Sequence, residues 1–147
     1  MVSSIKEVYL KNLTALINEI TLYSTEEDIW KIAPGIANSG GNLVLHLIGN
    51  LNYFIGTFLG NTGFVRDRDR EFSDKNIPKQ TLLADLTATT EMVISVIESL
   101  PEDDMEKLYP TDKFGEGKTI GYALVYLLAH LNYHLGQLNY HRRLIGN

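Results

Sequence analysis

The chain has 147 residues, a formal net charge of −5 and no cysteine. This length suits one domain with a sizeable hydrophobic core. Because the chain is acidic and its lysines and arginines form no stripe, we expect no nucleic-acid partner. The lack of cysteine rules out disulfides, thiolate metal ligands and a cysteine nucleophile. Segment 1–13 lacks the apolar run of a signal peptide, and the longest apolar stretch is broken by Asn and Gly, so we expect a cytoplasmic protein with no membrane-spanning segment.

Four segments show a helical period of apolar residues. They cover about residues 2–23, 40–60, 78–99 and 119–144, and each places apolar side chains at steps of three or four. No segment alternates apolar and polar residues as a strand would. The pattern predicts an all-α protein, with one four-helix bundle over residues 1–147 as its single domain.

Residues with capping side chains stand at the predicted helix starts. Ser39 and Thr119 are the expected N-caps of the second and fourth helices. Ser24 or Thr25 is expected to cap a short turn that leads to Trp30. A side-chain oxygen at such a position accepts a hydrogen bond from a backbone N–H that has no partner within the helix.

The segment RDRDREFSDK, residues 66–75, alternates in charge between the second and third helices. The favoured interpretation is a solvated loop with local ion pairs. The alternative interpretation is a substrate-binding role, in which Arg66, Arg68 or Arg70 holds an anionic substrate at the mouth of a pocket.

Three of the four histidines lie in the last predicted helix, in the stretch HLNYHLGQLNYH. His134 is about 40° round the helix from His130 and about 6 Å further along its axis. Two imidazoles with this spacing can bind one metal ion. His141 lies on the same face about 10 Å beyond His134, too far to share that ion. It is expected at the surface, where a cation is favoured near a helix end.

The fourth histidine, His46, is in the second predicted helix and belongs to a polar seam beside the apolar stripe. In one interpretation this seam lines a cavity, and in the other it faces water. The seam follows steps of three or four along the helix and consists of Ser39, Asn42, His46, Asn50, Tyr53 and Thr57.

Neither the second nor the fourth predicted helix contains Asp or Glu. A ferritin-like di-iron site needs glutamates from all four helices, and the helical zinc-protease motif needs Glu at position 131, which is Leu131 here. What remains is a set of neutral imidazoles, which would leave Zn²⁺ or Ni²⁺ with its full charge. Three protein ligands and an open position are typical of catalytic sites, where the ion acidifies a bound water or thiol.

Three stretches together resemble the DinB/YfiT-like superfamily, and within it the branch with a DUF1572-type pattern. They are NSGGNLVLHLIGNLNYFIG at 38–56, RDREF at 68–72 and LLAHLNYHLGQLNYHRRL at 127–144. The likeness spans nearly the whole chain. The most specific part is the pairing of a histidine in the second helix with His-x-x-x-His followed by Gly-Gln in the fourth.

The resemblance implies a four-helix bundle with up-down-down-up topology. It also implies a divalent metal ion, most often zinc or nickel, held by His46, His130 and His134, and it implies a homodimer. Some relatives are metal-dependent transferases that use a low-molecular-weight thiol such as bacillithiol or mycothiol, whereas others are isomerases or have no known activity. A chain without cysteine fits a thiol supplied as a cosubstrate.

Other polar residues near the histidines are weaker candidates for a catalytic role. Gln137 and Asn50 are each one turn from a histidine and are candidates to orient an imidazole. Tyr126 and Tyr133 flank the histidine face, where a hydroxyl can act as a general acid, although aromatic packing is the alternative. The functional hypothesis is a metal-dependent thiol transferase or hydrolase that acts on a small molecule. The alternatives are a non-catalytic binding or stress-related bundle, whose histidines are structural, and a metal-stabilised dimer.

Overall fold

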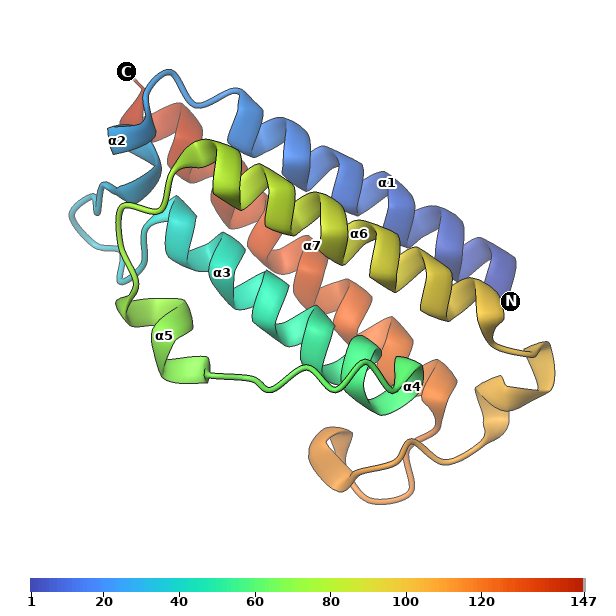
Figure 1. Ribbon diagram of the computed structural model, residues 1–147. Helices are drawn as coiled ribbons and strands as arrows, with labels where there is room; N and C mark the ends of the chain where they lie inside the picture. Colours follow the sequence, from blue (N-terminus) through green and yellow to red (C-terminus); the bar gives the residue numbers. More distant parts are fainter. Residues whose placement is uncertain (147) are drawn as a thin grey trace.

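The computed structural model describes residues 1–146, which form helices and irregular segments (Figure 1). Within that range the one β-type contact is an isolated bridge between Leu108 and Thr119, so the predicted all-α class is confirmed. The long helices are α1 (Val2–Thr21), α3 (Gly40–Leu51), α6 (Lys79–Ser99) and α7 (Ile120–Ile145). The shorter elements are α2 (Glu26–Trp30), the π-helical η1 (Asn52–Thr57), α4 (Phe58–Gly60), α5 (Arg68–Ser73) and the 3-10 turns η2 (Glu102–Glu106) and η3 (Asp112–Phe114).

The predicted capping residues cap their helices. Ser39, Thr25 and Thr119 each accept a hydrogen bond from the backbone N–H three residues later, at 3.1, 3.2 and 3.2 Å. The predicted helix over 40–60 is continuous, but its middle turns from α-helix to π-helix at Asn52. A π-helical turn adds a residue to the repeat, so side chains beyond Asn52 are rotated relative to an unbroken α-helix.

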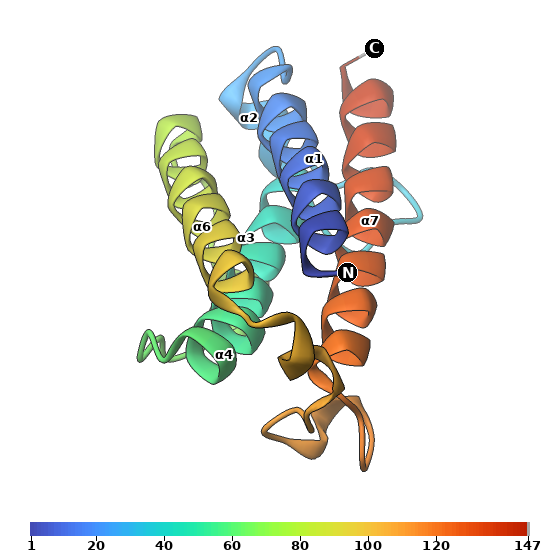
Figure 2. The ribbon, with the colours of Figure 1, turned by 90° about the vertical axis from the view of Figure 1, so that its right-hand side faces the viewer.

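The core lies between the four long helices. α1 packs against α6 and α7, and α3 packs against the same two helices. The connection from α6 to α7, which contains η2 and η3, lies at one end of this assembly (Figure 2). Because α3 and α7 are neighbours, side chains on their facing surfaces meet. The fully buried side chains include Tyr9, Leu13, Leu16, Ile20, Val44, Ile55, Leu82, Val93, Ile97, Leu124, Leu131 and Leu138.

His141 was predicted at the surface, and that prediction is wrong. The side chain is only 5% exposed, because α2 and the chain around it fold over the end of α7. Its Nε2 lies 2.8 Å from the Lys31 carbonyl oxygen and its Nδ1 lies 2.6 Å from the Tyr23 hydroxyl. A carbonyl only accepts, so Nε2 donates to Lys31, and Nδ1 shares a hydrogen bond with the Tyr23 hydroxyl. His141 is therefore a packing residue that ties α7 to the chain just after α1 and to the chain after α2.

Gly40–Gly60 is long and apolar enough, by length and composition, to cross a membrane, with a mean hydropathy of 1.4. The Asn and Gly residues of this segment do not lower its mean hydropathy below the value typical of a membrane-spanning helix. Half of the segment is buried within the protein, as in the core helix of a soluble protein. Asn42, His46 and Asn50 on this helix are themselves buried, so it carries polar groups into the interior of the bundle.

Glu19 joins the end of α1 to the end of α7. Its carboxylate accepts hydrogen bonds from Arg142 Nε at 2.6 Å and from Asn139 Nδ2 at 2.7 Å. Burial favours the protonated acid, but these two donors and the nearby positive charge outweigh burial and lower the pKa of Glu19 below its usual value.

We predict that Glu19→Gln lowers the free energy of unfolding by about 1–3 kcal/mol at pH 7. The pKa of Glu19 is lower in the folded chain, so its contribution is present above the unfolded pKa of about 4.3 and is lost as pH falls through the folded pKa. Urea unfolding of both proteins between pH 7 and pH 3 measures this, with Glu7→Gln on the exposed face of α1 as the control. A difference between wild type and Glu19→Gln that stays constant over this range would contradict the assignment.

Candidate metal centre

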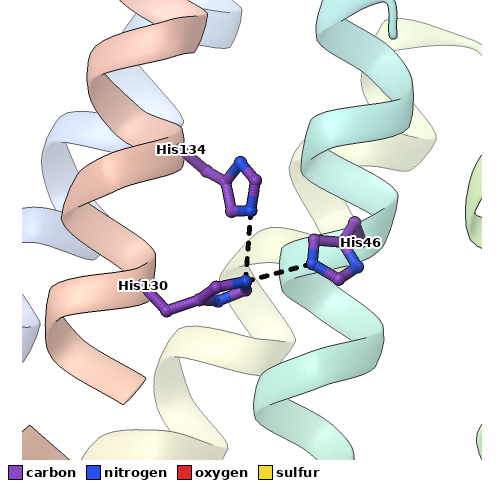
Figure 3. A group of neighbouring side chains, drawn as sticks. All are labelled: His46, His130 and His134. Carbon is purple, nitrogen blue, oxygen red and sulfur yellow. Dashed lines mark hydrogen bonds between the residues drawn. The ribbon is translucent and has the colours of Figure 1, made fainter. Parts of the chain in front are cut away.

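Three histidines from two helices, far apart in the sequence, converge on one point. His46 comes from α3, and His130 and His134 come from α7 (Figure 3). The Nε2 atom of His130 lies 3.2 Å from Nε2 of His46 and 3.1 Å from Nε2 of His134. One ligand nitrogen from each ring lies within 4.8 Å of the other two. The structure thus brings together the three histidines that the sequence singled out, in a cluster that can hold a metal ion.

The two helices approach closely at the end of α3 that precedes His46. A Cβ atom at Gly40 would clash with the Tyr23 hydroxyl oxygen and would lie 3.0 Å from Leu138 and 3.1 Å from His141 Nδ1, both on α7. Glycine at this position therefore leaves room for α7 to pack closely on the start of α3. His46 faces His130 six residues, or about one and two-thirds turns, later.

The outer nitrogens of two rings are held by oxygen acceptors. His46 Nδ1 lies 3.0 Å from Glu71 Oε1, and His134 Nδ1 lies 2.7 Å from Gln137 Oε1. A carboxylate oxygen and an amide oxygen accept, so both Nδ1 atoms donate. In a neutral imidazole the other nitrogen, Nε2, then presents its lone pair. This arrangement, in which an outer acceptor orients the ring, is typical of metal-ligating histidines.

The hydrogen-bonding count within the cluster leaves lone pairs facing one another. With His46 and His134 as neutral acceptors, only His130 Nε2 can supply a proton, and one proton cannot form two good hydrogen bonds. A cation at the centre would satisfy all three lone pairs. Ligands on a tetrahedral ion with bonds of 2.0–2.1 Å stand about 3.3 Å apart, close to the two Nε2 separations in the cluster. The donor set and its spacing therefore fit a divalent metal ion.

The surroundings of His130 and His134 disfavour the protonated forms of these two rings. Burial comes first, followed by repulsion from a proton on His134 or His46 and from the charge of Arg66, and together they lower the pKa of His130 to about 4. Burial is also the main reason that the pKa of His134 is lowered, against the opposing effect of its hydrogen bond to Gln137. A neutral imidazole is the form that binds metal, so at neutral pH no proton has to leave these two rings for an ion to bind.

Glu71 was not predicted as a site residue, and the structure places it behind His46. Its carboxylate is 6% exposed and accepts hydrogen bonds from His46 Nδ1, from Arg66 Nε at 2.8 Å and from Arg66 Nη2 at 2.9 Å. Burial raises the pKa of Glu71, but the bonds from His46 and Arg66 lower it more, so it is held as a carboxylate. A Cβ atom at Gly49 would lie 2.0 Å from Glu71 Oε2, so the carboxylate occupies space that only glycine leaves.

The prediction of a solvated loop over 66–75 is wrong in its central part. Residues Arg68–Ser73 form α5, which packs against α3 and buries Glu71. Asn42 fixes this packing by donating to the carbonyl oxygens of Glu71 at 2.9 Å and Asp74 at 3.0 Å. The first half of the polar seam on α3 is thus covered by α5 and does not face water.

The three candidate substrate-binding arginines lie in different surroundings. Arg66 is bound to Glu71 and its guanidinium lies 5.8 Å from the ring centre of Tyr53 and also of Phe54. Arg68 lies over the ring of Phe72. Arg70 forms an exposed ion pair with Asp74 at 3.1 Å. Of these three arginines, Arg66 is therefore the one near the cluster, and its charge is already balanced by the Glu71 carboxylate.

The remaining candidates differ in how close they come to the cluster. Gln137 bonds directly to His134. Asn50 is buried, and its Oδ1 has no hydrogen-bond partner among the described residues, as is also true of His130 Nδ1. Tyr133 is 65% exposed, with its ring 5.2 Å from that of His134, and Tyr126 is 53% exposed and packs on Phe114.

We predict that Glu71→Gln weakens zinc binding by about 10- to 100-fold, because a neutral amide neither orients the His46 ring as firmly nor balances Arg66. Gly49→Ala should weaken binding similarly, since the added methyl group displaces the same carboxylate. Competition against a chromogenic zinc chelator measures both affinities. Asp69→Asn, an exposed acid on the same short helix, is the matched control and should bind as wild type does. Unchanged affinity in both test variants would show that Glu71 does not support the site.

Comparison with known proteins agrees with this description and adds no activity to it. No curated protein and no solved structure gives a significant match to the chain. The sequence model of one family matches residues 3–147, almost the full length. The protein belongs to that family, which is described as "Protein of unknown function (DUF1572)".

Proposed function

We propose that the protein is a metal-dependent enzyme that acts on a small molecule, as a thiol transferase or as a hydrolase. His46, His130 and His134 would hold the ion, with zinc or nickel as the expected metal. The observation that supports this proposal is the meeting of three Nε2 atoms, two of which belong to rings whose Nδ1 atoms donate to Glu71 and Gln137. When bound, the ion lowers the pKa of a coordinated thiol or water toward neutrality and so provides a nucleophile at physiological pH.

The residues around the cluster would preserve the positive charge of the bound ion, on which this chemistry depends. Glu71 supports His46 from behind and does not reach the centre as a ligand, and its own charge is matched by Arg66. Gln137 holds His134 through a neutral amide. An ion bound by three neutral rings keeps its full positive charge, whereas a carboxylate ligand would reduce it.

We also assign the chain to the DinB/YfiT-like superfamily and its long helices to an up-down-down-up four-helix bundle. Two contacts support opposite directions for α1 and α6. Lys6, early in α1, bonds Glu98, late in α6, and Lys79 at the start of α6 bonds the carbonyl oxygen of Thr21 at the end of α1. In this proposal the thiol is a low-molecular-weight cosubstrate, and the protein is cytoplasmic.

An exposed stripe on α7 supports the proposal of a homodimer. Tyr126, Tyr133 and Tyr140 stand seven residues apart on the outer face of this helix and are 53%, 65% and 66% exposed. Leu144 continues the stripe at 67% exposed. A seven-residue repeat of large side chains keeps to one face of a helix and suits packing against the same helix of a second copy.

We predict that the protein purified without a histidine tag contains about one zinc or nickel ion per chain, measured by inductively coupled plasma mass spectrometry. His46→Ala and His130→Ala should each lose the ion, because two rings alone bind it much more weakly. His141→Gln removes the one histidine outside the cluster and is the control that should retain the ion. No ion in the wild type, and no rise in melting temperature when zinc or nickel is added, would refute the metal centre.

Activity assays on the wild type and the same histidine variants distinguish an enzyme from a non-catalytic, metal-stabilised bundle. An enzyme should consume a thiol in the presence of an electrophile, or hydrolyse an ester, at a rate that falls with the metal content of the variants. A protein that holds the ion and melts at a higher temperature, yet has no turnover across panels of thiols and esters, would be the non-catalytic alternative.

A further inference from the structure

A cavity of about 420 Å³ lies between the loop after α2 and the last turns of α7. Its volume is in the usual range for small-molecule sites. Its wall is largely apolar, and no Asp, Glu, Lys or Arg of the described residues lines it. The wall residues include Pro34, Ile36, Leu43, Tyr140, Leu144 and Ile145, of which Tyr140 and Leu144 also belong to the exposed stripe on α7.

The cavity lies next to the histidine cluster along α3 and α7, without any of the three histidines in its wall. Leu43 precedes His46 by three residues on α3, and Gln137 follows His134 by three residues on α7. The two helices run in opposite directions here, because Gly40 of α3 lies beside Leu138 of α7, whereas His46 lies beside His130. The step from His46 to Leu43 and the step from His134 to Gln137 therefore point in the same direction along the helix pair. The cavity begins about one helical turn, or roughly 5 Å, from the cluster.

Gln137 contacts both the histidine cluster and the cavity. Its Oε1 accepts the hydrogen bond from His134 Nδ1, and its side chain also lines the cavity. With the oxygen held by the ring, the NH₂ group of the same amide is the part that can donate to a ligand. Asn38 supplies a second amide to the wall. His141 adds a ring whose two nitrogens already form hydrogen bonds within the protein.

We infer that this cavity binds the uncharged, apolar group of the small molecule on which the metal centre acts, and that an aromatic ring carrying a neutral hydrogen-bond acceptor is the class it fits. This inference rests on the proposed function. A charged group would lose its hydration in the cavity and would meet no counter-charge there, whereas a ring gains from contact with the apolar wall. The amide of Gln137 then faces the acceptor of the ligand, on the side toward the histidines.

The test is a titration of the metal-free protein with benzamide, followed by two-dimensional ¹H–¹⁵N NMR. Benzoate, which has nearly the same shape but a negative charge, is the comparison ligand. We expect saturable shifts from benzamide at residues 33–38 and 137–145, with benzoate at least about tenfold weaker. Equal binding of the two ligands, or shifts confined to other parts of the chain, would overturn the inference.

A matched pair of variants locates the binding. Ile36 lines the cavity and is 42% exposed, whereas Ile32 in the same loop is 53% exposed and does not line it. Ile36→Asp should weaken benzamide binding by about tenfold or more, and Ile32→Asp should leave it unchanged. Ile145→Asp, on the opposite wall and outside the exposed stripe, should weaken benzamide binding as Ile36→Asp does, which shows that the effect is not confined to one loop variant. Unchanged binding in Ile36→Asp and Ile145→Asp would place the ligand elsewhere.

A further measurement distinguishes this inference from the proposed function. In protein loaded with paramagnetic Co²⁺, the protons of bound benzamide should relax faster than in protein loaded with diamagnetic Zn²⁺. Cobalt that binds without this effect would separate the cavity from the metal centre and overturn the inference. Failure of the protein to bind either metal would refute the metal centre itself, while the titration and its variants would still decide whether the cavity is a ligand site.

Discussion

The convergence of three imidazoles, whose Nε2 atoms face one another, is the interaction on which the proposed metal centre depends. In the absence of a cation, such an arrangement gains little from its own contacts, so the rest of the fold has to hold it. The packing of α3 against α7 sets the distance between the helices, and the one-turn spacing of His130 and His134 sets two of the rings. The site is therefore preorganised by the bundle.

The carboxylate behind His46 explains why α5 is part of the site. A buried carboxylate is costly unless it is paired and hydrogen-bonded, and Glu71 meets both conditions through Arg66 and His46. It needs the space above Gly49, and it arrives there because Asn42 binds the backbone of the chain around α5. The polar seam on α3 thus has two tasks: it presents one imidazole to the centre, and it anchors the segment that orients that imidazole.

Local features of the sequence were enough to predict the helices and to single out the histidines, whereas the grouping of His46 with His130 and His134 rested on the family resemblance. Apolar periodicity marks the long helices, and Ser39 and Thr119 mark two of their starts, because capping depends on neighbouring residues alone. Glu71 was missed, since it meets His46 across 25 residues and stands in a run of charges that usually faces water. His141 was misplaced for a related reason: the chain that covers the end of α7 comes from more than 100 residues earlier. Sequence patterns within one helix do not report which other segment will cover it.

Two neighbouring environments of opposite character lie along α3 and α7. At the cluster, three neutral donors favour a concentrated positive charge, and one turn further along an uncharged apolar wall disfavours any charge. A molecule that places an apolar group in the cavity would bring its polar, reactive end toward the histidines, because the reverse orientation leaves a polar group without hydration against apolar side chains. Gln137 lies at the boundary and is bonded to His134, so in the proposed function it would link the orientation of a ligand to the orientation of a metal-binding ring. The juxtaposition of these two environments would then itself select neutral substrates and align them.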